Sequence, residues 1–110
     1  MIIRIFRATT KPGKAAEFEA RARALTVPYL KAQPGLLAFF PGKSLDPNGG
    51  EFVVVTVWDS LESLEAFAGP GWRMMTIPPE ELPLAEREVV EHFQAYGDSS
   101  AGPPSPGSPA

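Results

Sequence analysis

Phe52–Gly69, which reads FVVVTVWDSLESLEAFAG, has the pattern of a complete strand followed by a complete helix. Phe52–Trp58 is a run of β-branched and aromatic residues, which is typical of a strand. Asp59 or Ser60 can cap the next helix, and Glu62 stands three residues after Asp59, as a capping box requires. Apolar residues then recur at helical spacing until the glycine that closes the stretch. The stretch therefore predicts a strand that leads directly into a helix.

The segments on either side repeat the same alternation of strand and helix. The other expected elements are a strand over Met1–Thr10, a helix from Lys14 to about Gln33 that Pro28 kinks, and strands over Leu36–Phe40 and Glu88–Tyr96. The resulting order is strand, helix, strand, strand, helix, strand. It predicts an α+β, ferredoxin-like βαββαβ fold with an antiparallel four-stranded sheet.

Residues 1–97 are long enough for one domain with one core, and residues 98–110 differ from them in composition. The last segment consists almost wholly of Gly, Pro, Ser and Ala, and it has no apolar surface to bury. We therefore expect one domain over 1–97 and a disordered tail over 98–110.

The composition of the chain excludes several classes of partner. The formal net charge is −3 over 110 residues, and the charges are interspersed, so neither a nucleic acid nor an anionic membrane is expected to bind. The chain has no Cys and one His, so we predict no metal site. No apolar run approaches the length of a membrane span, and we expect a cytoplasmic location.

The strand Phe52–Trp58 is apolar on both of its faces, because Val and aromatic residues occupy the odd and the even positions alike. Two helices can cover only one face of a four-stranded sheet. We therefore predict a homodimer that packs sheet against sheet. In the alternative, the Pro-rich segment 70–84 folds over the open face.

Three segments resemble the antibiotic-biosynthesis-monooxygenase-like members of the dimeric α/β-barrel superfamily. They are TTKPGKAAEFE from Thr9, VVVTVWDSLESLEAFAG from Val53 and VVEHFQAYG from Val89. The resemblance covers the chain from Met1 to about Tyr96 and is carried most by the Trp-Asp-Ser-x-Glu junction. It implies a dimeric α/β barrel with a pocket between the helices and the sheet of each subunit.

The resemblance also implies a chemistry for the best-known branch of the family. That branch oxidises an aromatic polyketide with O₂ and holds no cofactor, so none is expected here, and the ligand is a small apolar or aromatic molecule. The haem-degrading branch carries an Asn, a Trp and a His at positions that align roughly with Phe6, Phe67 and Ile77. Because all three side chains differ, the comparison argues against haem degradation by that mechanism.

His92 is the only histidine, and its usual pKa makes it the first candidate for a general base. The alternative is a structural histidine that holds a backbone hydrogen bond. Arg4 and Arg7 lie on the strand expected to pair with the His92 strand, so one of them can lie beside it. Arg7 is the candidate partner that stabilises an oxyanion, and an ion pair with Glu91 is its structural alternative.

Aromatic and Met side chains supply the candidate walls of an apolar pocket. The candidate ligand-binding residues are Trp72, Trp58, Phe67, Met75, Tyr29 and Phe39. Plain core packing is the alternative for each of them, and for Trp58 most of all. Pro78–Glu81 can form a lid over the pocket or a rigid connector.

Three functions remain open at this stage. The first is a cofactor-independent monooxygenase, or a related small-ligand enzyme, in which His92 and Arg7 are catalytic. The second is a non-catalytic dimer that binds a small molecule or acts in stress. The third is a haem-binding protein with His92 as the axial ligand.

Overall fold

The computed structural model describes residues 1–46, 48–75 and 79–97, so the predicted tail over 98–110 lies outside the described residues. The elements follow the predicted order of strand, helix, strand, strand, helix, strand. They are β1 (Ile2–Thr10), α1 (Ala15–Arg21), the π-helical turn η1 (Ala22–Thr26), α2 (Val27–Lys31), β2 (Leu36–Lys43), β3 (Glu51–Trp58), α3 (Leu61–Ala68), the 3₁₀ turn η2 (Pro79–Glu81) and β4 (Ala85–Gln94).

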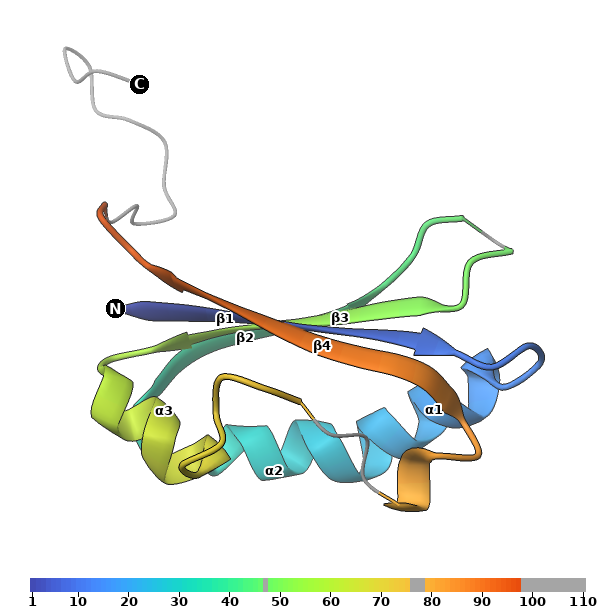
Figure 1. Ribbon diagram of the computed structural model, residues 1–110, viewed down its shortest axis with the longest axis horizontal. Coiled ribbons are helices and arrows are strands. Elements are labelled where there is room, and N and C mark those ends of the chain that lie inside the picture. The colour runs from blue at the N-terminus through green and yellow to red at the C-terminus, as the bar shows by residue number, and fades with distance from the viewer. Residues whose placement is uncertain (47, 76–78, 98–110) are drawn as a thin grey trace, which may run out of the picture.

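The four strands form one antiparallel sheet in the order β2-β3-β1-β4. The helices all lie against the same face of this sheet, and the opposite face is open (Figure 1). This is the ferredoxin-like α+β fold, so the predicted fold class is confirmed. Within the described residues, no helix is both long enough and apolar enough to cross a membrane.

The strand register sorts the side chains onto the two faces of the sheet. On β1, Arg4 lies opposite Thr56 of β3 and His92 of β4, and these residues share the face that the helices cover. Ile5 lies opposite Val55 and Glu91, on the open face. The odd positions of β1, of β3 and of β4 from Arg87 onward therefore face away from the helices, whereas Ala85, before a shift in register, lies opposite Thr10.

The stretch that decides the fold forms the strand and helix expected of it, and the cap is Ser60, one of the two predicted residues. Ser60 is the N-cap of α3, and its hydroxyl accepts a hydrogen bond from the Ser63 backbone N–H. Asp59 instead accepts from the Ser60 and Ser63 hydroxyls, which lower the pKa of its carboxyl, the Ser63 bond having the larger effect. The expected pairing of Asp59 with Glu62 is therefore replaced by one of Ser60 with Ser63. Gly69 ends the helix at φ 82°.

The first helix contains one π-helical turn, and this turn ends directly before the α2 segment that contains Pro28. Proline has no backbone N–H, and its ring collides with the carbonyl of the preceding turn. A wider turn at this point takes up the misfit, so the helix continues past the proline. Ala22, Thr26 and Val27 from this widened region line the cavity described below.

The fourth strand begins at Ala85, earlier than predicted, because Ala85 is part of the core. Ala8, Phe18, Leu84 and Ala85 form a buried cluster, and the Lys11 backbone N–H donates to the Leu84 carbonyl at 2.7 Å. These contacts fix the start of β4 beside the end of β1. As a result, Glu88 lies inside the sheet rather than at a strand end.

Candidate active site

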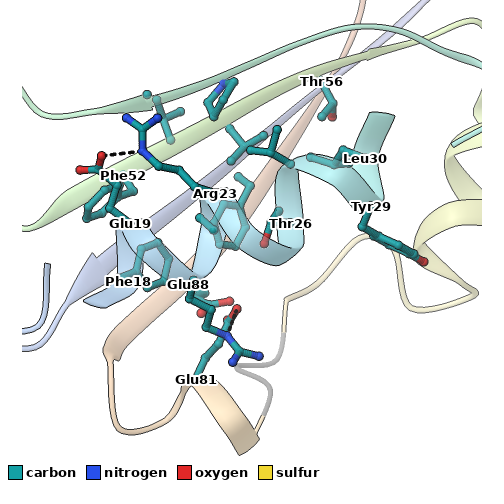
Figure 2. A pocket seen from close by; sticks show the side chains of 18 of the residues that line it. Phe18, Glu19, Arg23, Thr26, Tyr29, Leu30, Phe52, Thr56, Glu81 and Glu88 are labelled. Atoms are coloured by element: carbon teal, nitrogen blue, oxygen red, sulfur yellow. Dashed lines mark hydrogen bonds and ion pairs between the residues drawn. The ribbon is translucent and has the colours of Figure 1, made fainter. Parts of the chain in front are cut away.

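A cavity of about 850 Å³ lies between the sheet and the α1–η1–α2 helix. Figure 2 shows it from close by, with side chains from both layers pointing into it. Its apolar wall includes Phe6, Phe18, Leu30, Phe52, Val54 and Phe67. A cavity of this size with a mostly apolar lining suits a small, largely apolar ligand.

Arg4 is the charged group at one end of the cavity, and it is only 8% exposed. Its Nη1 atom donates to the Trp72 backbone carbonyl at 2.9 Å and lies 3.1 Å from His92 Nε2. Because a guanidinium has only donors, His92 Nε2 must accept, which places the imidazole proton on Nδ1. The Trp72 ring meets His92 edge-on, with 4.8 Å between the ring centroids.

The protonation of His92 follows from its surroundings. Burial lowers the pKa of the imidazole, and the positive charges of Arg4 and then Arg73 lower it further. Arg73 itself lies over the Trp72 ring, with its guanidinium carbon 4.5 Å from the ring centroid. His92 is therefore neutral near pH 7 and can take up a proton. Burial also lowers the pKa of Arg4, but a guanidinium stays charged in a protein.

Glu88 lies toward the other end of the cavity and is 6% exposed. Neither of its carboxyl oxygens has a hydrogen-bond partner among the residues that the structure describes. Burial, and then the nearby Glu81 carboxyl, raise the pKa of Glu88 to about 8. Figure 2 shows the two carboxyl groups together below Phe18. Glu88 therefore carries a proton at neutral pH.

The charged neighbours of this carboxyl pair come from α1 and η2. Arg21 Nη2 lies 3.8 Å from Glu80 Oε1, and Arg21 Nε lies 3.9 Å from Glu81 Oε1. Arg21 therefore pairs with the two glutamates of η2, and within the described part of the chain Glu88 forms no ion pair. Within residues 1–46, 48–75 and 79–97, no group of three or more His, Asp or Glu side chains is placed to hold a metal ion.

Ion pairs between α1 and β2 form another part of the cavity lining. Glu19 accepts from Lys43 Nζ through one oxygen and from Arg23 Nε through the other, both at 2.8 Å. Both bonds lower the pKa of Glu19, and the bond from Lys43 has the larger effect. The pairs tie the helix to the end of β2 beside the cavity.

The predicted ligand-binding residues divide into two groups. Phe67, Met75 and Tyr29 line the cavity. Trp58 is 0% exposed and stacks on Phe67, with 4.9 Å between the ring centroids, so it supports the wall without lining it. Phe39 and Trp72 are also absent from the lining, although the Trp72 carbonyl holds Arg4.

The two predicted catalytic residues lie on opposite faces of the sheet. Arg7 is on the open face, where its Nε atom forms an ion pair with Glu91 Oε1 at 3.2 Å. This is the structural alternative given above for Arg7. The residue that meets His92 is Arg4, which the sequence places on the same strand without distinguishing it from Arg7.

Sequence reasoning missed the acidic end of the cavity entirely. The available signal was the alternation of β4, since Glu88 has the same parity as Val90 and His92, whereas Glu91 has the opposite one. A carboxylate on the inward parity of a strand is an anomaly that calls for a partner or a function. Glu81 and Arg21 carry no comparable signal, because only the tertiary fold brings them to Glu88.

Comparisons with known proteins agree with the fold. The family model of the antibiotic biosynthesis monooxygenases matches residues 1–70. SnoaB, a cofactor-independent oxygenase from Streptomyces nogalater, was solved as a variant and is 24% identical, with a TM-score of 0.63 over 88% of this chain and 94% of its own. MhuD, a haem-degrader from Mycobacterium tuberculosis with two haems bound in its active site, is 21% identical, with a TM-score of 0.66 over 91% of this chain and 100% of its own.

At these identities the two solved structures support the fold alone, and no curated protein sequence matches the chain. The family model is more specific, because it covers more than half of the chain, from β1 through α3. That region supplies Arg4, the helices over the cavity and the Trp58–Phe67 wall. The chain belongs to the antibiotic biosynthesis monooxygenase family.

Proposed function

We propose that the protein is a cofactor-independent oxygenase that acts on an electron-rich aromatic compound, a phenol or an anthrone, in the cavity. The observation that carries this proposal is the contact of 3.1 Å between Arg4 Nη1, which lines one end of an apolar cavity, and the neutral His92, which lies beside Arg4 but does not itself line the cavity. A base beside a fixed cation is suited to removing a proton and stabilising the oxyanion that results. Arg4 takes the role that we predicted for Arg7.

The reaction needs no electron carrier, because the substrate itself reduces O₂. The substrate oxygen takes over the hydrogen bond from Arg4 Nη1 and so frees the lone pair of His92 Nε2. An anthrone-type CH₂ group then gives a proton to Nε2, and the Arg4 guanidinium stabilises the negative charge that develops on the ring oxygen. The electron-rich carbon then bonds to one oxygen atom of O₂. Loss of water leaves a carbonyl, so that R₂CH₂ and O₂ give R₂C=O and H₂O.

The residues around Arg4 prepare it for this role. Its Nη1 atom already spans the Trp72 carbonyl and His92, so the guanidinium is held in place before a substrate binds. The apolar wall keeps water away from the charged intermediate, which strengthens the attraction between Arg4 and an oxyanion. Family membership and the fold shared with the oxygenase SnoaB support the same reaction class.

The alternatives from the sequence are a non-catalytic dimer that binds small molecules and a haem-binding protein. The geometry around His92 does not suit an axial ligand, because its Nε2 atom faces the cationic Arg4. Phe6 and Phe67, two of the three positions at which the haem-degrading branch differs, both line the cavity, and Ile77 lies outside the described residues. A Soret band that stays unshifted when the protein is mixed with haem would remove the haem-binding function.

We also propose that the protein is a homodimer, formed through the open face of the sheet. Phe40 and Phe93 are 63% and 47% exposed, and the apolar Ile3, Ile5 and Val55 share that face with Phe93. An apolar sheet face of this kind needs a partner in water. Light scattering should report twice the chain mass of 11.8 kDa, and a monomer would contradict the dimer.

Oxygen uptake with an anthrone substrate tests the oxygenase. We expect uptake by the wild type and its near-complete loss in His92→Ala. Glu86→Gln, an exposed change at the start of the same strand, is the matched control and should keep full activity. An inactive wild type, or a fully active His92→Ala, would show that the assignment is wrong and would favour the binding protein.

A further inference from the structure

Glu88 is a buried acid that the proposed oxygenase reaction does not use. Both of its carboxyl oxygens are fully buried and lack a hydrogen-bond partner among the described residues. Leaving such a group unpaired destabilises the fold, so an unpartnered buried carboxyl in a cavity wall is expected to have a function.

The groups that face Glu88 do not supply the missing partner. Arg21 of α1 pairs with Glu80 and Glu81 of η2. Phe18 and Ala8 border the carboxyl on the apolar side. Glu81 adds a second carboxyl group, which raises the pKa of Glu88 through hydrogen bonding and then through its negative charge, although neither Glu88 oxygen has a partner at hydrogen-bond distance among the described residues. The surroundings therefore favour a neutral carboxylic acid, whose O–H group is a hydrogen-bond donor.

We propose that Glu88 is a ligand-recognition residue that donates a hydrogen bond from its carboxylic acid to a carbonyl oxygen of the bound aromatic molecule. The class of ligand, an aromatic molecule with its oxyanion at Arg4, rests on the proposed function. The hydrogen bond itself requires binding only, without turnover.

The spacing of the two polar ends defines the shape of that ligand. Glu88 and His92 lie four residues apart on the same face of β4, which corresponds to about 13 Å along a strand. Arg4 lies beside His92, and the side chains between the two ends are apolar, Phe6 and Val54 among them. A flat, fused-ring molecule with an anionic group at one end and a ring carbonyl beyond it fits this pattern.

Two probes of the same shape separate the carbonyl contact from the rest of the ligand. Anthraquinone-2-carboxylate has an anionic end and ring carbonyls, and anthracene-2-carboxylate lacks only the carbonyls. Anthraquinone is already oxidised, so its binding does not depend on oxygenase activity. Equilibrium dialysis of each probe against the full-length protein gives the ratio of the two dissociation constants, which is the quinone selectivity.

We expect the quinone selectivity at pH 6 to fall about fivefold in Glu88→Met, the effect of one hydrogen bond. Glu88→Gln should retain the selectivity, because its amide can donate. Glu86→Gln is the matched control and should equal the wild type. Raising the pH from 6 to 9 should reduce the wild-type selectivity to that of Glu88→Met, as the carboxyl loses its proton, and leave that of Glu88→Gln unchanged.

A change to a neighbouring titratable group tests whether the loss of selectivity at high pH comes from the Glu88 carboxyl. Glu81→Gln removes the neighbouring negative charge, so the loss of wild-type selectivity should move to lower pH in that variant. Arg21, Glu80 and Glu81 are the charged groups that pack around Glu88, and of these Glu81 is the one that opposes its ionisation.

The proposal is overturned if Glu88→Met has the same quinone selectivity as the wild type at pH 6, or if the wild-type selectivity does not change up to pH 9. The two proposals fail separately. Selectivity that depends on Glu88 without oxygen uptake would leave a binding protein, whereas oxygen uptake with unchanged selectivity would leave an oxygenase in which Glu88 does not bind the ligand.

Discussion

Arg4 and Glu88 are buried ionisable groups on the same face of neighbouring strands, but Arg4 is charged at neutral pH and Glu88 is neutral. Arg4 is held by the Trp72 carbonyl and by His92 Nε2, whereas Glu88 has no hydrogen-bond partner among the described residues. Burial acts on both in the same direction, toward the neutral form, since it lowers the pKa of Arg4 and raises that of Glu88. Arg4 nevertheless stays charged, because the intrinsic basicity of a guanidinium is very high. The Arg4 end of the cavity is therefore charged at neutral pH, and the Glu88 end is neutral.

The largest expected effect is the loss of that one charge. Arg4→Met removes the proposed stabilisation of the oxyanion, and loss of one such group typically lowers turnover by about 100-fold or more. Oxygen uptake with saturating anthrone substrate measures this loss. Arg4→Lys keeps the charge without the planar fork, so it should fall between Arg4→Met and the wild type.

Arg7→Met is the contrasting variant on the same strand. Arg7 lies on the open face and pairs with Glu91, and both side chains are about half exposed. An exposed pair of this kind contributes at most about 1 kcal/mol. Turnover per folded subunit should stay within about twofold of the wild type, and a loss as large as that of Arg4→Met would return the catalytic role to Arg7.

The proton at the Glu88 end should appear in the pH dependence of stability. The folded-state pKa is about 8 against an ordinary value of 4.5, so the folded protein binds the proton more tightly than the unfolded chain. The free energy of unfolding should therefore fall as the pH rises from about 4.5 to 8, with a slope of at most about 1.4 kcal/mol per pH unit, and level off above that.

Glu88→Met should remove this slope and stabilise the protein by about 1–3 kcal/mol near pH 8, because an apolar side chain leaves no buried carboxyl unpaired. Urea unfolding at several pH values measures both quantities, with Glu86→Gln as the control. A Glu88→Met protein that is less stable than the wild type at pH 8 would mean that Glu88 has a stabilising partner.

His92 should show the opposite pH dependence at the Arg4 end. Its pKa is lowered by burial first and by Arg4 second, so the unfolded chain takes up a proton before the folded protein does. This contribution to stability is complete above the ordinary pKa of about 6.5 and is lost as the pH falls toward the folded-state value. In Arg4→Met, the pKa of His92 measured by proton NMR should rise but stay below the ordinary value, since burial remains. An unchanged pKa would show that Arg4 does not act on His92.

Most of the fold could be predicted from the sequence, because local chemistry carries it. The alternation of β3, the cap region at Asp59–Ser60 and the closing Gly69 are all encoded within a few residues of where they act. The cap was predicted only as Asp59 or Ser60, because both are good N-caps and only the path of the chain decides between them. Gly35 shows what that path requires, since at φ 83° its carbonyl accepts from the Asp59 N–H and a Cβ would collide with Ser63.

The site was predictable only in part, because it depends on which face each strand presents. Phe67, Met75 and Tyr29 were found, since apolar pockets are lined by aromatic and Met side chains. The choice between Arg4 and Arg7 needed the register of β1 with β4, which no local pattern fixes. Glu88 was missed because charged residues on strands are usually exposed, and its burial follows from core contacts that start β4 at Ala85.

Arg21→Met should have the smallest effect and tests whether the acidic end is organised by charge pairing at all. Arg21 meets Glu80 and Glu81 only at 3.8 and 3.9 Å, and its side chain is about one-third exposed, so its removal should lower the free energy of unfolding by less than about 1 kcal/mol. Arg23→Met, which breaks the shorter 2.8 Å pair with Glu19, is the matched control in urea unfolding. If burial alone keeps Glu88 protonated, both variants retain the wild-type slope of stability against pH. A slope that continues to higher pH in Arg21→Met and not in Arg23→Met would instead show that the positive charge of Arg21 lowers the pKa of Glu88, so that charge as well as burial would set the protonation of this end of the cavity.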